Sequence, residues 1–262
     1  MIARTARAVR GRRRDRPADA APPAPDAPIE DDAGGCVVRL EDVHVRLGER
    51  DVLRGVSLEL REHRVGVVGA NGSGKSTLAR LLNGLVVPTA GRVLVDGLDT
   101  RRQGAAVRRR VGFVFTDPDA QIVMPTVAED VAYSLRGVPA DERAAVVRRA
   151  LAARGRAEHA DHPAHLLSGG QKQLLALTSV LAAGPRLVVA DEPTTLLDLR
   201  NTRRVAAELA SLPQQVVLVS HDLALMDAMD RVLVVDGGRV VADDAPGPAV
   251  AHYRRLVDAG PG

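Results

Sequence analysis

The sequence is poor in aromatic residues and in cysteine, and it contains no long hydrophobic run. Two Phe, two Tyr and no Trp occur among 262 residues, so a folded core must be built mainly from Val, Leu and Ala. The single cysteine excludes a disulfide framework and a cluster of thiolate metal ligands, and it fits a reducing compartment. No apolar run reaches the roughly 18 residues that span a bilayer. A role at a membrane would therefore depend on a partner chain.

Lysine is nearly absent as well, because all but two of the 36 Lys and Arg residues are arginine. Against 33 acidic residues the formal net charge is only +3, which gives no reason to expect binding to nucleic acid. A sequence that uses arginine for almost every cation nevertheless has Lys75 inside the stretch GANGSGKST. The choice of lysine at this position therefore indicates a chemical role that arginine cannot fill.

Residues 69–77 have the spacing G-x-x-x-x-G-K-[ST] of a phosphate-binding loop. Glycines let successive backbone N–H groups face a phosphate, and the compact ammonium of Lys75 fits beside it where a planar guanidinium would not. An apolar run at 64–68 precedes the loop and helical apolar spacing follows it at 78–85, which is the order of strand, loop and helix that the motif requires. The predicted nucleotide-binding residues are Gly69, Ala70, Asn71, Gly72, Ser73, Gly74, Lys75, Ser76 and Thr77.

Apolar runs alternate with loop and helix patterns along most of the chain. The runs that we interpret as strands are 37–47, 56–60, 64–68, 91–97, 111–115, 186–191 and 215–222. Such alternation predicts an α/β fold with a mostly parallel sheet, covered on both faces, whose binding groups lie at the carboxyl ends of the strands. Residues from about 118 to about 175 show helical patterns without strands, which predicts an inserted helical subdomain.

Residues 1–35 differ in composition from the rest, with an arginine-rich part followed by the Pro/Ala tract ADAAPPAPDAP. Such a segment cannot bury a core, so we expect a disordered tail before a folded domain at 36–262. A spacer, or a start codon assigned too early, is the favoured interpretation. A contact of the arginines with anionic lipid or nucleic acid is the alternative.

Two carboxylates, Asp191 and Glu192, end the apolar run LVVADEP. Alone they would suggest a helix cap or a turn, but beside a phosphate-binding loop they match the needs of phosphoryl transfer. Asp191 would support a Mg²⁺ ion and Glu192 would orient and deprotonate a water molecule. His221, near the end of the run VVLVSHD, is a candidate for a contact with the terminal phosphate, and a structural role is the alternative.

A second anion site is predicted where LLSGGQKQLLAL begins at residue 166. Ser168 can cap the helix that starts with the two glycines, so the positive end of that helix would face an anion. The segment LSGGQ, preceded by the phosphate-binding loop and followed in order by LVVADEP, TTLLD and VSHD, resembles the nucleotide-binding subunits of ABC transporters over residues 37–244. The resemblance implies a P-loop NTPase core with an N-terminal antiparallel β subdomain and an inserted helical subdomain.

The resemblance also implies ATP and Mg²⁺ as cofactors and a dimer, of two identical chains or of two related ones, in which LSGGQ of one chain closes over ATP held by the other. By position, Ser76 and Asp191 are the metal ligands, Glu192 is the general base and His221 contacts the γ-phosphate. Ser168, Gly169, Gly170 and Gln171 are the contacts made across the dimer, and Asp198 lies in the interface loop.

Two positions depart from the pattern of the family. Leu47 stands where an aromatic residue usually stacks on adenine, so stacking is replaced by an apolar contact. Thr116 stands where a glutamine usually reaches the metal and the attacking water, so direct coordination is not expected and a bridging water is the alternative.

Residues 118–121 (PDAQ) and 126–132 (TVAEDVA) resemble the energy-coupling-factor importers, in which Thr116 and Gln121 would belong to the loop that couples to membrane subunits. The resemblance implies an ATP hydrolase at the cytoplasmic face of the membrane, with transmembrane subunits and a membrane-embedded substrate-binding subunit as partners. The solute would be a vitamin, with biotin favoured, or a transition-metal ion. The alternative is a soluble ABC ATPase such as an iron–sulfur assembly factor, which would not bring down integral membrane proteins.

Overall fold

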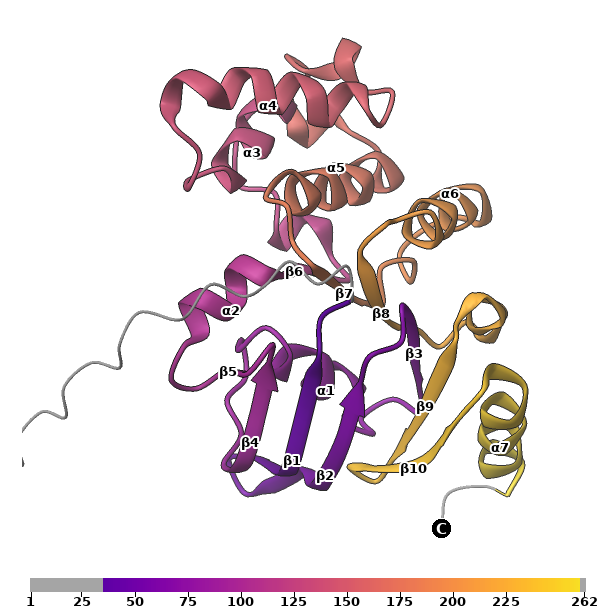
Figure 1. The fold of residues 1–262 in the computed structure, drawn as a ribbon. Coiled ribbons are helices and arrows are strands. Elements are labelled where there is room, and N and C mark those ends of the chain that lie inside the picture. Colours follow the sequence, from indigo (N-terminus) through magenta and orange to yellow (C-terminus); the bar gives the residue numbers. More distant parts are fainter. Residues whose placement is uncertain (1–34, 260–262) are drawn as a thin grey trace, which may run out of the picture. The chain divides into compact units, whose positions relative to one another are not determined.

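The computed structural model describes residues 35–259, and the predicted tail lies almost wholly outside them. Its main layer is a six-stranded sheet with the strand order β10-β9-β3-β8-β7-β6 (Figure 1). All neighbours in it are parallel except β9 and β10. The strands are β3 (Arg64–Val68), β6 (Val111–Val114), β7 (Leu187–Asp191), β8 (Gln215–Val219), β9 (Arg231–Asp236) and β10 (Arg239–Asp244).

The central strands β3, β7 and β8 are buried at every residue. Continuous apolar runs suit strands that are covered on both faces, which explains why the sequence shows no alternation there. Because β3, β7 and β8 run parallel, the segments that follow them emerge at one edge of the sheet. This arrangement brings residues 69, 192 and 220 to a common edge.

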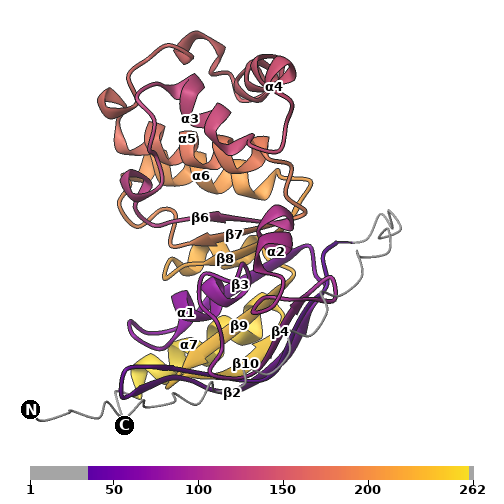
Figure 2. The same cartoon turned by 90° about the vertical axis from the view of Figure 1, so that its left-hand side faces the viewer.

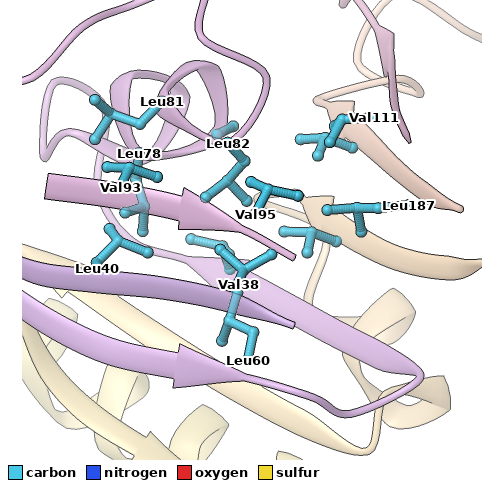
Figure 3. Close-up of a cluster of buried hydrophobic side chains, with 14 of the residues drawn as sticks. Val38, Leu40, Leu60, Leu78, Leu81, Leu82, Val93, Val95, Val111 and Leu187 are labelled. Carbon is cyan, nitrogen blue, oxygen red and sulfur yellow. The ribbon is translucent and has the colours of Figure 1, made fainter. Parts of the chain in front are cut away.

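A second, antiparallel sheet has the order β2-β1-β4-β5. Helix α1 (Lys75–Leu81) packs with both sheets in one hydrophobic cluster, which Figure 3 shows with side chains from β1, α1, β4 and β7 pointing toward one another. Since this cluster continues from one sheet to the other, the start of α1 is firmly held. The strands of the second sheet are β1 (Val38–Leu47), β2 (Arg50–Leu60), β4 (Ala90–Val95) and β5 (Leu98–Asp99).

The segment that follows β6 is helical up to β7. It has its own hydrophobic cluster, to which α3, α4 and α5 contribute Val131, Leu151 and Leu175. Figure 2 shows α3 and α4 on the side of α5 that faces away from the six-stranded sheet. The elements are η1 (Pro118–Ala120), α3 (Val127–Ser134), α4 (Ala140–Ala152), η2 (Ala157–His159), η3 (Ala164–Leu166) and α5 (Gly169–Ala182).

The chain after β8 differs from the simple alternation that the sequence suggested. A 3₁₀ helix, η4 (Leu223–Ala228), replaces an α-helix, and a hairpin of β9 and β10 follows. Gly237 and Gly238 turn this hairpin with φ of 51° and 80°, a left-handed pair that a two-residue turn requires. The sequence contains the pattern typical of such a hairpin, a Gly-Gly pair between two apolar runs. The remaining helices are α2 (Gly104–Arg110), α6 (Leu199–Ala210) and α7 (Pro246–Asp258).

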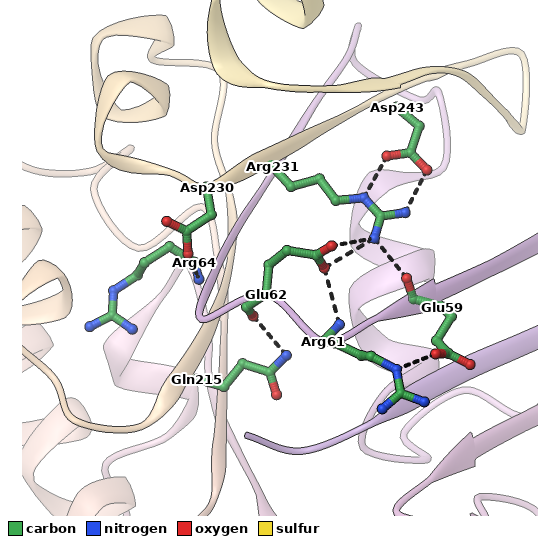
Figure 4. A network of polar contacts seen from close by, with 8 residues as sticks. All are labelled: Glu59, Arg61, Glu62, Arg64, Gln215, Asp230, Arg231 and Asp243. Carbon is green, nitrogen blue, oxygen red and sulfur yellow. Dashed lines mark hydrogen bonds and ion pairs between the residues drawn. The ribbon is translucent and has the colours of Figure 1, made fainter. Parts of the chain in front are cut away.

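The side chain of Arg231 connects the hairpin to the end of β2, a strand of the four-stranded sheet (Figure 4). Arg231 donates to both oxygens of Asp243 at 2.5 and 2.6 Å, and also to Glu62 at 2.9 Å and to the backbone carbonyl of Glu59 at 2.7 Å. These bonds to carboxylates raise the pKa of Arg231 above its ordinary value, with Asp243 as the largest cause. The network joins β10, β9 and the end of β2.

Candidate functional site

The predicted phosphate-binding loop connects β3 to α1. Lys75 is the first helical residue and only 6% exposed, and its Nζ donates to the carbonyls of Gly69 at 2.8 Å and Ala70 at 3.0 Å. Burial lowers the pKa of Lys75, and the nearby carboxylates of Glu192 and Asp191 oppose that shift. An ammonium has three N–H donors, so one remains for an anionic ligand.

Two of the loop glycines are required by the space around them. A Cβ on Gly69 would lie 2.1 Å from the carbonyl oxygen of Val235, and one on Gly74 would lie 2.8 Å from a methyl of Leu53. Gly74 also has φ of 111° directly before the helix. The first N–H groups of α1 have no partner within the helix, so the loop presents donors to a phosphate.

Two oxygen ligands suited to a divalent cation lie side by side at the strand edge. The Ser76 hydroxyl donates to Oδ1 of Asp191 at 2.8 Å, and Arg80 donates to Oδ2 at 3.3 Å. The Asp191 side chain is 1% exposed, and this burial raises its pKa, against the effects of Ser76 and Arg80. A hydroxyl and a carboxylate oxygen fit Mg²⁺, which completes its shell with water and phosphate oxygens.

Glu192 and His221 meet at the same edge. Oε2 of Glu192 lies 2.7 Å from Nδ1 of His221 and accepts from Thr195 Oγ1 at 2.9 Å. Glu192 also has φ of 51°, a left-handed conformation that costs about 1 to 3 kcal/mol in a residue other than glycine. Such strain persists only where neighbouring contacts hold it, and the bonds from Thr195 and His221 do so here.

Residues of the phosphate loop, the start of α1 and Glu192 line an open pocket of about 320 Å³, a volume within the range of ligand sites. Asp191 and His221 are not part of its lining. The pocket extends from the loop and Glu192 to side chains of β1 and β2, including Leu47, which is 54% exposed. Its lining residues are Leu47, Arg50, Val52, Asn71, Gly72, Gly74, Lys75, Ser76, Thr77 and Glu192. Sequence reasoning missed Arg50 and Val52, which no motif marks.

The residues predicted to act across a dimer begin α5 and are absent from the lining of this pocket. The predicted cap is confirmed, since the hydroxyl of Ser168 accepts from the N–H of Gln171, whose side chain accepts in turn from the N–H of Ser168. Ser168 and Gly169 are exposed, whereas Gly170 is buried and a Cβ on it would lie 2.3 Å from the Asn201 side chain.

Asp198 caps the neighbouring helix α6. Its carboxylate accepts from the backbone N–H of Asn201 at 2.8 Å and from the Asn201 side chain at 2.9 Å. The first of these bonds is the main cause that lowers the pKa of Asp198. The start of α5 and the start of α6 are thus joined through Asn201, a residue that sequence reasoning did not single out.

The Thr116 hydroxyl lies against the protein backbone. It donates to the backbone carbonyl of Asp191 at 2.7 Å, which ties the end of β6 to the end of β7. Gln121 turns back on β6 as well, where its side chain accepts from the N–H of Phe115 and donates to the carbonyl of Phe113, each at 3.2 Å. Gln173 of α5 donates to the carbonyl of Phe115 at 3.0 Å. The loop is therefore held by three polar side chains.

The fold, the phosphate loop and the strained carboxylate beside it define a nucleotide-binding protein. The family model for ABC transporters matches residues 53–195, more than half of the chain. A putative ABC transporter ATP-binding protein of Deinococcus radiodurans is 54% identical over 220 residues, which cover 83% of this chain and 97% of the relative.

A second relative and a solved structure are also similar to this chain. The biotin transport ATP-binding protein BioM of Rhizobium etli is 44% identical over 84% of this chain and 98% of its own length. The solved structure of cbiO1 from Clostridium perfringens, part of the ABC transporter complex cbiONQ, superposes with a TM-score of 0.74 and 29% identity, covering 86% of this chain and 96% of that chain.

The chain belongs to the ABC transporter family and is an ATP-hydrolysing subunit of a transporter. The resemblance and the fold class predicted from the sequence are thereby confirmed. No helix within residues 35–259 is long and apolar enough to cross a membrane.

Proposed function

We propose that this chain energises an energy-coupling-factor importer for a vitamin or a transition-metal ion, with biotin as the favoured solute. The observation that carries the proposal is the pair of elements at 118–121 and 126–132, together with a relative that is named as a biotin transport protein. The alternative of a soluble iron–sulfur assembly factor is not favoured, because the relatives are named as transporter subunits.

The nucleotide would lie with its phosphates on residues 69–77, and Ser76 and Asp191 would hold Mg²⁺. The metal would supply charge neutralisation of the phosphates. Glu192 accepts a proton from the attacking water, and its hydrogen bonds with Thr195 and His221 fix the carboxylate that does so. Lys75 offers a donor to the terminal phosphates from a position that two backbone carbonyls define.

A second ATP-binding subunit, either a copy of this chain or a related chain, completes the site. Ser168 and Gly169 are exposed at the start of α5 and do not line the pocket of their own chain. Presented by the second subunit, they would place a capped helix N-terminus against the γ-phosphate. Asp198 and Asn201 hold the adjoining helix beside that surface.

The helical region of about 118 to 175 would act as a subdomain that meets the transmembrane subunits at the cytoplasmic face of the membrane. The segment that leads into it carries Thr116 and Gln121, and Lys172 of α5 forms an ion pair of 2.6 Å with Asp119 in the same segment. A force on this segment would thus reach both β6 and α5, the helix that Ser168 caps.

The test is to purify the tagged full chain from solubilised membranes and to measure solute uptake in cells with and without it. We expect integral membrane proteins to co-purify and biotin uptake to be lost on deletion and restored by the gene. If deletion abolished the uptake of cobalt or nickel and left biotin uptake intact, the solute would be that metal ion. A chain that co-purifies only with soluble proteins, and whose deletion leaves uptake intact, would contradict the proposal.

A further inference from the structure

The part of the pocket that β1 and β2 form has no aromatic side chain for a nucleobase. All four aromatic residues of the chain are engaged elsewhere. Phe113 and Phe115 pack on each other with ring centroids 4.7 Å apart, Tyr133 lies under Arg136, and Tyr253 packs against a hydrophobic cluster. None of them lines the pocket.

Three side chains outside the loop and Glu192 line this end, namely Leu47, Arg50 and Val52. Because Lys75 fixes the phosphate end, the base of a bound nucleotide would lie over these three. Only Arg50 among them carries a flat π-system, its guanidinium group. We propose that the guanidinium of Arg50 is the surface on which the nucleobase stacks, an inference that rests on the nucleotide site proposed above.

Arg50 is held in a defined place. Its Nη2 donates to the carbonyl of Gly72 at 3.0 Å, and a Cβ on Gly72 would lie 3.4 Å from the same nitrogen. The Nη2 end of the guanidinium is therefore held on the phosphate loop. The neighbouring Asp51 pairs with Arg46 at 2.7 Å, and no carboxylate among residues 35–259 forms an ion pair with Arg50.

This arrangement favours stacking over a purely electrostatic role. One N–H of the guanidinium is used on Gly72, which orients the group, and Arg50 is exposed. A lysine at this place would retain the charge but would offer no plane. Stacking on a base face does not read the hydrogen-bonding edge, so adenine and guanine nucleotides should depend on Arg50 to the same degree.

The experiment compares nucleotides with a ligand that has no base. Binding of ATP, GTP and tripolyphosphate, each with Mg²⁺, is measured for the full chain by competition with a fluorescent nucleotide. Arg50→Ala removes the plane and the charge, and Arg50→Lys removes the plane alone. Arg54→Ala is the matched control, because Arg54 is exposed on the same strand and does not line the pocket.

We expect both Arg50 variants to weaken ATP and GTP binding by about three- to thirtyfold, the range of a cation–π contact. Arg50→Lys keeps the charge beside the loop and should leave tripolyphosphate binding unchanged, whereas Arg50→Ala should weaken tripolyphosphate binding less than ATP binding. Arg54→Ala should bind all three ligands as the wild type does. Adding Leu47→Tyr to Arg50→Ala should restore ATP binding, because a ring again offers a stacking surface.

Three results would overturn the inference. Equal losses for ATP and tripolyphosphate in Arg50→Ala would show that Arg50 only braces the loop. Wild-type binding by Arg50→Lys would show that charge alone matters, and wild-type binding by Arg50→Ala would show no role. Failure of the proposed nucleotide site is a distinct result, in which Lys75→Ala binds ATP and tripolyphosphate as tightly as the wild type.

Discussion

At the scale of single residues, Glu192 is the most constrained group of the site. Its positive φ and its bonds with Thr195 and His221 hold one carboxylate oxygen in place. We expect Glu192→Gln to lower ATP hydrolysis by more than about 100-fold, because an amide cannot accept the proton of the attacking water. Nucleotide binding should persist.

Glu142→Gln on the exposed face of α4 is the control. Phosphate release at wild-type rates by Glu192→Gln would contradict the role of Glu192 as the general base.

Thr116 has a different kind of role. Its hydroxyl bonds the carbonyl of Asp191, so its loss should shift the end of β7 without removing a ligand. Thr116→Ala should lower hydrolysis by less than about 10-fold and stability by about 1 kcal/mol, the net worth of one hydrogen bond. Thr116→Ser keeps the hydroxyl and should recover both values. Rate assays and urea unfolding measure them, and an effect as severe as that of Glu192→Gln would make Thr116 a catalytic residue.

Lys75 introduces a pH dependence of nucleotide binding. Burial lowers its pKa in the free chain, and anionic phosphates bound beside it would raise that pKa again. Binding then favours the protonated lysine, so the affinity is complete below the pKa of the free chain and falls as the pH rises through it. Titrations from about pH 7 to about pH 10 should show weaker binding at the alkaline end. A constant affinity would show that bound phosphate does not interact with the ammonium.

At the scale of elements, Arg231 links strands that the sequence separates widely. It bonds Asp243 on β10 and reaches Glu62 and Glu59 at the end of β2, while its side chain is 20% exposed (Figure 4). Arg231→Ala should lower the free energy of unfolding by about 2 kcal/mol, a value typical of hydrogen bonds to charged groups. Arg239→Ala, exposed on the same hairpin, should change it by less than about 0.5 kcal/mol. Equal unfolding curves for the two variants would contradict this role.

At the scale of the whole molecule, the hydrophobic clusters of the described chain are built from residues 36 onward. The composition of residues 1–34 provides little apolar surface to add to them. We therefore expect a chain that starts at residue 35 to retain the melting temperature, ATP affinity and hydrolysis rate of the full chain. Calorimetry and rate assays on the two purified chains provide the comparison, and a fall of several degrees in melting temperature would refute the expectation.

Much of this protein follows from short stretches of sequence. Residues 69–77 predict their own strand, loop and helix because glycine conformations, an ammonium and a helix start are local properties. The same holds for Ser168, whose cap on α5 involves only residues three positions apart. Continuous apolar runs also predicted that β3, β7 and β8 are buried on both faces.

Other features were decided only when distant segments packed together. Arg80 reaches Asp191 across 111 positions, Thr116 reaches the carbonyl of Asp191 across 75, and Gly170 makes room for Asn201 of α6. Arg50 lies on the phosphate loop 22 positions further along. No local pattern marks these pairs, because the partner of a side chain depends on strand order and helix packing. The sequence therefore determined which functional side chains are present, and the tertiary structure determined which atoms those side chains contact.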